Sequence, residues 1–413
     1  MSPASFELPL KAGEAASLAD LTMQVLENRR AQDDLRNRLA ARSTALNLTS
    51  IRPYWGSLQQ DPVHANAFYL AVDGLSAPKP QPMLLRFALA SAPASPLFPA
   101  SRLVGRMRPG AGLREVVVNA VPFGPGDTEA IETFAGQVDR AFLPRPQGSA
   151  PSITAITGKP ETEVPALFEG FRLVMKSTGL NVASIGAPPG RATETLAASV
   201  WSAIRAGWRN GFNVEAEPLD PVAPDFADAV RTQSAFTRFR LPVADTGGAL
   251  APDLLGWALD DFGRRFAIAE QNYTFDPDEV KDLAAHLGPA LVRLTDAVDL
   301  IRRERVAAGL GRAFDLEIVM PDAAGRRELL FCLHWLKAQG RPAQQVSAHP
   351  ESVAEARARA AIARHFGATL SFDADSLPGL PGAAQWSGAR WNCRLRGEHT
   401  VDRVVATVAA LRS

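Results

Sequence analysis

The sequence predicts an α/β protein in which a (β/α)8 barrel follows a small N-terminal α+β module. After residue 150, short apolar runs alternate with segments of helical periodicity, which is the pattern of βα units. This alternation occurs eight times in about 260 residues, the usual size of a closed barrel. A doubly wound open sheet is the competing fold, but no GxGxxG loop follows the first predicted strand.

The two periodicities also place the individual elements of the barrel. Strands are expected to begin at Ser152, Asn181, Phe212, Phe236, Phe314, Gln344, Ala368 and Ala389. Helices are expected over residues 161–177, 192–208, 224–232, 277–308, 325–338 and 350–365, with a last helix from Thr400. The segment 247–272 is longer than a normal βα loop, and insertions of this kind often cap or shape a site.

The N-terminal part of the chain has a different pattern. Apolar residues at helical spacing predict a long amphipathic helix over residues 12–43. Three β-rich runs (FYLAVDG, MLLRFALA and REVVVNAV) and a helical stretch over 127–142 follow, and a Pro-rich linker separates them from the barrel. We therefore expect an N-terminal helix in residues 1–46, an α+β module in 47–146 and the barrel in 150–413.

The amino-acid composition limits the kinds of binding partner that we expect. Lys plus Arg equals Asp plus Glu, at 44 each, so no global charge would attract nucleic acid or an anionic membrane. The two cysteines allow neither a disulfide framework nor a Cys-rich zinc site. The N-terminus does not have the pattern of a signal peptide, and no segment is long and apolar enough to span a membrane. We expect a cytoplasmic protein, and the excess of Arg, Ala and Pro over Lys suggests a bacterial genome.

Carboxylates dominate the polar residues at the C-terminal ends of the predicted strands, where barrel enzymes carry their active sites. Glu215 and Glu217 share one face of a strand, and Asp373 and Asp375 have the same spacing. Each pair could hold a divalent cation through oxygen ligands or supply an acid and a base. Solvated loop carboxylates are the simpler interpretation of either pair.

Glu317 is the clearest candidate for a functional carboxylate. In FDLEIVMPD its neighbours are apolar, so strand alternation directs Glu317 into the barrel lumen. A buried carboxylate needs a partner, and a structural ion pair with Arg394 or Arg396 is the alternative to a catalytic role.

His349 is the best-placed histidine for metal binding or proton transfer, because it follows the sixth strand directly. The absence of GxSxG, HExxH, P-loop and paired CxxC motifs disfavours serine hydrolases, zincins, P-loop NTPases and zinc ribbons.

Several segments resemble the tagaturonate epimerase family, which interconverts the ketohexuronates tagaturonate and fructuronate in a metal-dependent reaction. They are SVWSAIRAGWRNGFNVEAEPLD, FDLEIVMPD with the helix RELLFCLHWLKAQG, AIARHFGATLSFDADS and GARWNCRLRGEHTVDRVVATVAAL, together with VVVNAVPFGPGDTEAIETF in the N-terminal module. The family's fifth-strand glutamate corresponds to Glu317. Its histidines correspond here to Pro218, Asp373 and Asn392, which implies a changed metal preference or a loss of activity.

The resemblance implies a sugar-acid or keto-sugar epimerase or isomerase. Glu217 and Glu317 would then move a proton in opposite senses, and a divalent cation held by Asp373, Asp375 and His349 would polarise the substrate. The expected substrate-binding residues are Glu215, Asn392 and Arg394, whose planar fork suits a carboxylate. The first alternative is a catalytically inactive barrel that binds carbohydrate or regulates, and the second is a lyase or aldolase. The sequence leaves an oligomer open.

Overall fold

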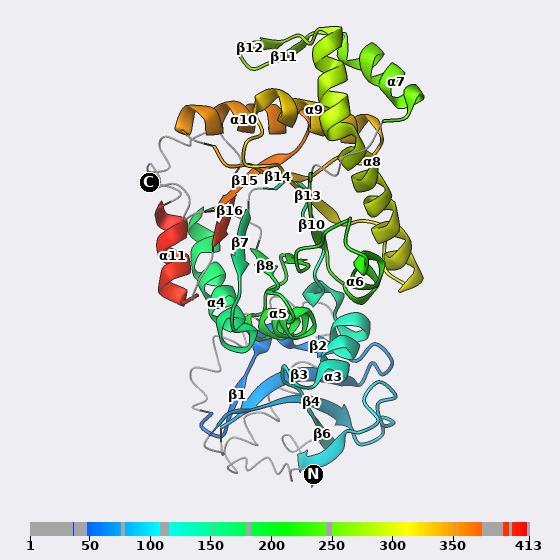
Figure 1. Ribbon diagram of the computed structural model, residues 1–413. Coiled ribbons are helices and arrows are strands. Elements are labelled where there is room, and N and C mark those ends of the chain that lie inside the picture. The colour runs from blue at the N-terminus through cyan, green and yellow to red at the C-terminus, as the bar shows by residue number, and fades with distance from the viewer. Residues whose placement is uncertain are drawn as a thin grey trace. The chain divides into compact units, whose positions relative to one another are not determined.

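A computed structural model describes residues 36, 48–75, 79–107, 115–150, 152–178, 183–244, 250–350, 352–373, 391–395 and 399–410 (Figure 1). The chain divides into two compact units. The first comprises Met1–Leu143 with Ala197–Arg209, and the second comprises Pro144–Leu196 with Asn210–Ser413. The predicted domain limits stay predictions, and the predicted N-terminal helix lies outside the described residues except for Arg36, which is helical.

The first unit is built on an antiparallel sheet in the order β1-β3-β4-β6-β5, with β2 paired to β3. The strands are β1 (Ile51–Pro53), β2 (Gln59–Gln60), β3 (Ala67–Gly74), β4 (Gln81–Leu89), β5 (Arg102–Met107) and β6 (Val116–Pro122). The three predicted β-rich runs form β3, β4 and β6. Phe68 and Phe87 stack in the core of this unit, with ring centroids 4.9 Å apart.

The helix predicted over residues 127–142 is interrupted. The α-helix α3 covers only Thr128–Thr133, a wider π turn follows over Phe134–Val138, and a short 3-10 turn covers Arg140–Phe142. Asp139 adopts an extended backbone between the two turns. Its carboxylate accepts a hydrogen bond from the Ala141 N–H and pairs with Arg209, and these contacts fix the break.

Eight strands in the described part of the second unit close into a parallel barrel, which confirms the predicted fold class. Each of them falls within a strand segment expected from the sequence. They are β7 (Ser152–Ile156), β8 (Ala183–Gly186), β9 (Phe212–Glu215), β10 (Arg238–Pro242), β13 (Asp315–Val319), β14 (Gln345–Ser347), β15 (Thr369–Asp373) and β16 (Trp391–Leu395). The pairing of β16 with β7 closes the ring.

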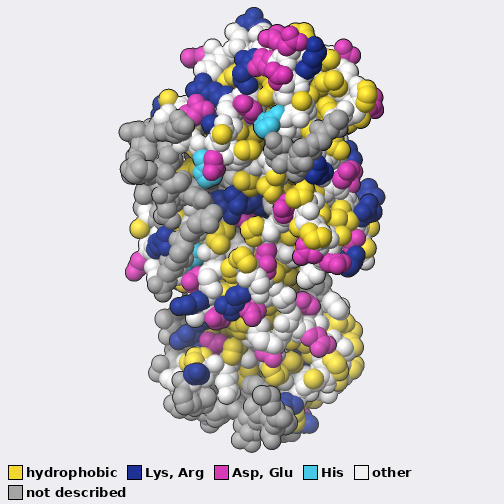
Figure 2. Space-filling model, in the orientation of Figure 1, with side chains coloured by type: hydrophobic (Ala, Val, Ile, Leu, Met, Phe, Trp, Pro, Cys, Tyr) yellow, Lys and Arg dark blue, Asp and Glu magenta, His cyan; other side chains and the backbone are white. Residues whose placement is uncertain are grey.

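Helices follow most of the strands, as the sequence predicts, because each carries an apolar stripe that packs on the outside of the sheet (Figure 1). They are α4 (Pro160–Thr178), α5 (Ala192–Ala206), α6 (Phe226–Thr232), α8 (Pro277–Ala307), α9 (Arg326–Ala338), α10 (Val353–His365) and α11 (Val401–Ala410). No helix in the described part of the chain is long and apolar enough to cross a membrane. Figure 2 shows basic and acidic side chains interspersed over the face in view.

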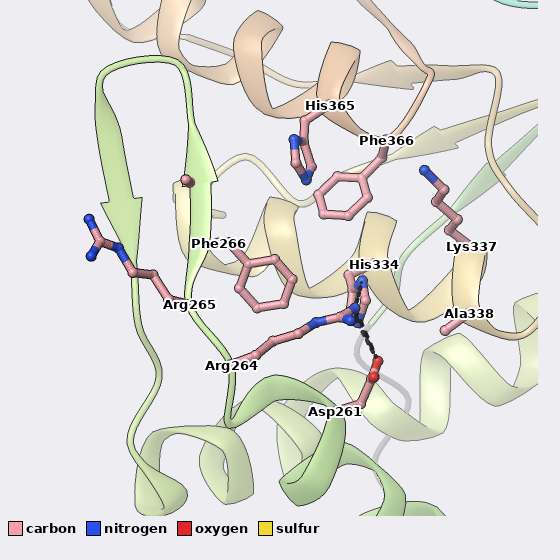
Figure 3. A pocket seen from close by; sticks show the side chains of 10 residues that line it. Asp261, Arg264, Arg265, Phe266, His334, Lys337, Ala338, His365 and Phe366 are labelled. Carbon is pink, nitrogen blue, oxygen red and sulfur yellow. Dashed lines mark hydrogen bonds and ion pairs between the residues drawn. The ribbon is translucent and has the colours of Figure 1, made fainter.

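The insertion expected between β10 and α8 forms its own small structure. It contains α7 (Pro252–Phe262) and a two-stranded hairpin of β11 (Phe266–Ile268) and β12 (Gln271–Tyr273). The insertion packs against α8 and α10. Its side chains lie next to the last turns of α9 and α10 (Figure 3).

Candidate functional site

The lumen of the barrel is polar. Barrels of this type are usually filled by layers of Val, Ile and Leu. Here strand alternation turns polar side chains inward, and hydrogen bonds between strands that are not neighbours show that these side chains meet across the lumen. The fully or almost fully buried polar side chains on the barrel strands are Thr154, Ser184, Asn213, Glu215, Arg238, Asp315, Glu317, Gln345, Ser347, Thr369, Ser371, Asn392 and Arg394.

Glu215 and Arg394 form the strongest contact in the lumen. The guanidinium group of Arg394 donates two parallel hydrogen bonds to the Glu215 carboxylate, with N–O distances of 2.8 and 2.6 Å. Burial alone would raise the pKa of Glu215. The charge and hydrogen bonds of Arg394, together with the charges of Arg238 and Arg240, outweigh burial and lower that pKa to about 2. Glu215 is therefore a permanent anion near neutral pH and a poor proton acceptor.

Glu317 lies in the lumen, as the sequence predicts, and its side chain is fully buried. It accepts a hydrogen bond from the Ser347 hydroxyl on the next strand. Three guanidinium groups surround its carboxylate, at N–O distances of 3.3 Å from Arg394, 3.6 Å from Arg240 and 3.9 Å from Arg238. The predicted ion pair with Arg394 is present, while Arg396 lies outside the described residues.

Arg238 and Arg240 also lie at this site, although they were not among the site residues predicted from the strand ends. They alternate with Phe239 and Leu241 along β10, the same pattern that identified Glu317. Arg238 is fully buried and donates to the Thr154 hydroxyl at 2.7 Å, while its Nε and Nη2 atoms have no hydrogen-bond partner within the described residues. Arg240 lies two residues nearer the C-terminal end of β10, and its side chain is 17% exposed.

Three guanidinium groups lie near the carboxylates of Glu215 and Glu317 among the described side chains. The remaining buried carboxylate on these strands, Asp315, lies at the N-terminal end of β13 and accepts hydrogen bonds from the Gln147 and Gly148 N–H groups and from Asn213. Burial raises the pKa of Asp315, and the charge of Arg238 opposes this rise. Arg238 therefore compensates Asp315 as well, and the partly exposed Arg240 has the fewest carboxylate contacts of the three guanidinium groups, a single one with Glu317.

Asn392 belongs to a hydrogen-bonded layer of neutral side chains. Its amide nitrogen donates to Gln345 and to Ser371, both at 2.8 Å, and its amide oxygen accepts from Thr154 at 3.1 Å. These bonds orient the amide and connect it through Thr154 to Arg238. The predicted role of Asn392 in substrate binding stays a prediction.

Glu217 lies apart from the lumen cluster. It follows β9, is partly exposed, and accepts hydrogen bonds from the N–H groups of Gly190 at 2.9 Å and Ala192 at 3.0 Å. Ala192 is the first residue of α5, so this carboxylate satisfies N–H groups at the start of a helix and interacts favourably with its dipole. The geometry assigns Glu217 a structural contact, and its predicted role in proton transfer stays a prediction.

A Glu217→Gln variant separates these two roles. If the carboxylate mainly holds the start of α5, the free energy of unfolding should fall by about 1 kcal/mol, the usual value of a helix cap. Any activity measured for the parent protein should then remain within about twofold, a loss far smaller than removal of an acid or base would cause. A large loss of turnover at unchanged stability would instead support the catalytic assignment.

The predicted metal-binding residues are mostly outside the part of the chain that the structure describes. Asp373 ends β15, but its side chain is not described, and Asp375 lies outside the described residues. The side chain of His349 is 44% exposed, and its Nε2 lies 3.5 Å from a carboxylate oxygen of Asp322. Within the described residues, no three His, Cys, Asp or Glu side chains form a group that could hold a metal ion.

The chain is similar to known proteins in its three-dimensional structure. No protein-family model matches the chain, and no curated protein matches it. One of the solved structures that align with the chain is the fructuronate-tagaturonate epimerase UxaE from Cohnella laeviribosi. Its complex with one glycerol aligns with a TM-score of 0.58 and 12% identity over 87% of this chain and 74% of the other. The complex with two glycerols aligns with a TM-score of 0.57 and 13% identity over the same shares of the two chains. The chain therefore has a fold similar to that of this epimerase.

Proposed function

We propose that the chain is an epimerase or isomerase of a small sugar acid, with its site in the polar lumen of the barrel. One observation carries this proposal: three guanidinium groups surround two buried carboxylates, and one of the three, Arg240, is partly exposed. A lumen of this kind offers charge and hydrogen-bonding groups to a polar anion rather than to an apolar ligand. The fold shared with a fructuronate-tagaturonate epimerase supports the same class of substrate.

Arg240 is the residue proposed to bind the substrate carboxylate. Arg394 was the expected partner of that group, but its guanidinium already forms a two-bond contact with Glu215. Within the described residues Arg240 has no such contact, since the carboxylate oxygen that it pairs with, on Glu317, is 3.6 Å away. Its planar fork can therefore donate two parallel hydrogen bonds to a carboxylate.

Glu317 is the residue proposed to move the proton. Fructuronate and tagaturonate differ at C4, which is not adjacent to the C2 carbonyl, so the step proposed is a retro-aldol cleavage followed by re-addition. Loss of the C4 hydroxyl proton breaks the C3–C4 bond and leaves an aldehyde and an enediolate, and addition of the enediolate to the other face of the aldehyde gives the epimer. Glu317 would take the C4 hydroxyl proton and return it once the new bond has formed, and the Ser347 hydroxyl, which donates to it, would connect the carboxylate to the substrate oxygens. The adjacent guanidinium groups would stabilise the negative charge of the enediolate.

The cluster around Glu215 and Glu317 does not fit a divalent cation. Both carboxylates already face guanidinium groups, and three positive charges within 4 Å would repel a metal ion. We propose that a divalent cation would be held elsewhere, by Asp373, Asp375 and His349. The chemistry supplied by such an ion would be polarisation of the substrate oxygens.

Interconversion of the two hexuronates tests the proposed reaction directly. The full-length protein would be incubated with fructuronate or tagaturonate in deuterium oxide, with and without Mg2+ or Mn2+, and proton NMR would follow the C–H signals of both sugars. Fructose is the matched control, because it keeps the keto sugar and has no carboxylate. We expect interconversion with the hexuronates alone. Absence of interconversion in both directions, under every metal condition, would reject the epimerase.

An Arg240→Gln variant tests the proposed carboxylate contact. We expect hexuronate binding, measured by calorimetry, to weaken by about tenfold or more, because one charge-assisted pair is lost. Binding of fructose should not change. Arg303→Gln is the matched control, since Arg303 is an exposed arginine on α8. Equal weakening in both variants, or none in either, would contradict the assignment of Arg240.

A barrel that binds a sugar acid without transforming it is the second candidate. Two observations favour it: Glu215 is held as an anion by Arg394, and the Glu317 side chain is fully buried. Tight hexuronate binding that depends on Arg240, in the absence of any interconversion, would select this candidate.

A further inference from the structure

A pocket lies outside the lumen, where the insertion meets the last turns of α9 and α10 (Figure 3). Its volume is about 480 Å³, within the range of small-molecule sites. None of the lumen residues described above contributes to its lining. The side chains that the argument uses are Asp261, Arg264, Phe266, His334, Lys337 and Phe366.

The pocket has more positive than negative charge. Arg264, Arg265 and Lys337 line it, and Asp261 is its one lining carboxylate. Asp261 is already engaged, since one of its oxygens is hydrogen-bonded to His334 and lies 3.7 Å from Arg264. Lys337 has no ion pair within the described residues. These cations repel one another. A ligand with one or two negative charges would attract each of them and would offset that repulsion.

Two aromatic rings lie directly beside the cations. The guanidinium group of Arg264 is 5.2 Å from the centre of the Phe266 ring, and Nζ of Lys337 is 5.8 Å from the centre of the Phe366 ring. Figure 3 shows the two rings, with His334 below Phe366 and the side chain of Arg264 reaching toward His334. The pocket thus combines a cationic rim with flat apolar walls, which is suited to an aromatic body carrying an acidic group.

We propose that this pocket binds a small aromatic anion, whose carboxylate or phosphate lies between Arg264 and Lys337 and whose ring packs against Phe266 and Phe366. The pocket is separate from the proposed sugar-acid site, so the two proposals can fail independently. Its walls come from the insertion and from two barrel helices, and a bound ligand would hold the insertion against the barrel.

Two histidines couple this binding to pH. Burial lowers the pKa of both His334 and His365, and the charges of Lys337 and Arg264 lower them further, against the opposing effect of Asp261 on His334. The charged groups facing them are Asp261 from α7, Arg264 and Arg265 from the turn after α7, and Lys337 from α9. An anion favours the protonated imidazoles, so its affinity should increase as the pH falls below 6.5, the ordinary pKa from which both values are lowered.

Calorimetry with the full-length protein tests the proposal, using phenyl phosphate and benzoate as probes. Inorganic phosphate supplies the charge without the ring, and benzyl alcohol supplies the ring without the charge. We expect at least one of the two aromatic anions to bind about tenfold more tightly than inorganic phosphate or benzyl alcohol. The reason is that it contacts both the cations and the aromatic rings of the pocket. Comparison of phenyl phosphate with benzoate identifies the preferred acidic group.

Two variants locate the binding. Lys337→Gln should weaken the aromatic anion by about tenfold, as expected for loss of a charge-assisted hydrogen bond, and Lys337→Arg should restore most of the affinity. Arg303→Gln, on an exposed part of α8, should bind like the parent protein. Absence of binding by both probes at millimolar concentration would overturn the proposal. So would equal affinity of Lys337→Gln and the parent protein, since the anion would then lie elsewhere.

Discussion

Replacement of Arg394 by Met should lower the free energy of unfolding by about 3–5 kcal/mol at pH 7, the usual loss when one partner of a buried ion pair is removed. The side chain is 3% exposed and contacts both Glu215 and Glu317, so the variant leaves two buried carboxylates with less compensation. Denaturant unfolding followed by circular dichroism measures the change. Arg172→Met is the control, because the Arg172–Glu169 pair is about half exposed and should contribute less than about 1 kcal/mol.

The same variant should reverse the pH dependence. In the parent protein the pKa of Glu215 is lowered from 4.5 to about 2, so this group stabilises the fold above about pH 4.5 and its contribution is lost as the pH falls toward 2. Without Arg394, burial raises that pKa, and the variant should gain stability on mild acidification. The free energies of unfolding of the parent protein and of the variant should therefore become more similar as the pH falls below 5.

A double variant, Glu215→Met with Arg394→Met, shows whether the loss comes from charge. It removes both members of the pair, and apolar side chains of similar length fill the space. We expect it to recover at least about half of the stability lost by Arg394→Met, as replacement of buried ion pairs by packed apolar groups often does. A double variant that is less stable than the single one would show that Arg394 supports the barrel through packing instead.

Glu317→Gln should reduce the rate of hexuronate interconversion by about 100-fold or more, the range for loss of a catalytic acid or base. The amide keeps the shape of the side chain and can still accept from Ser347, so the reacting group is the main change. Proton NMR in deuterium oxide measures the rate.

Glu215→Gln is the matched comparison, because it also removes one carboxylate from the same three guanidinium groups. We expect similar losses of stability in the two variants. Glu215→Gln should raise KM more than it lowers kcat, since Glu215 is held by Arg394 and has a pKa of about 2. Interconversion that survives in Glu317→Gln but disappears in Glu215→Gln would reverse the assignment.

Much of the barrel could be predicted from the sequence because strand and helix periodicities are local. Alternation in FDLEIVM was enough to place Glu317 in the lumen, where it is fully buried. The same alternation in FTRFRLP is enough to place Arg238 and Arg240 in the lumen, although neither residue lies at the strand end where barrel enzymes carry their catalytic groups. Periodicity gives the face on which a residue lies, and here it was informative for both signs of charge.

The pairing of the lumen residues was harder to predict than their orientation. Glu215 and Arg394 are 179 residues apart, and their contact depends on how the ring closes. Glu217 shows the same limit at short range. It follows Glu215 by two residues, yet the strand ends at Glu215, and beyond it Glu217 contacts N–H groups at the start of α5. A two-residue spacing predicts a shared face only while the strand continues.

The polar lumen has a consequence for how sequences with this fold can vary. In an apolar core a position can change alone, provided that volume is roughly kept. In this lumen a single change at Glu215, Glu317, Arg238, Arg240 or Arg394 leaves an unmatched charge among buried groups. Relatives that keep this arrangement should therefore exchange these positions in correlated sets, and Glu215 should change together with Arg394 more often than with any residue on the outside of the barrel.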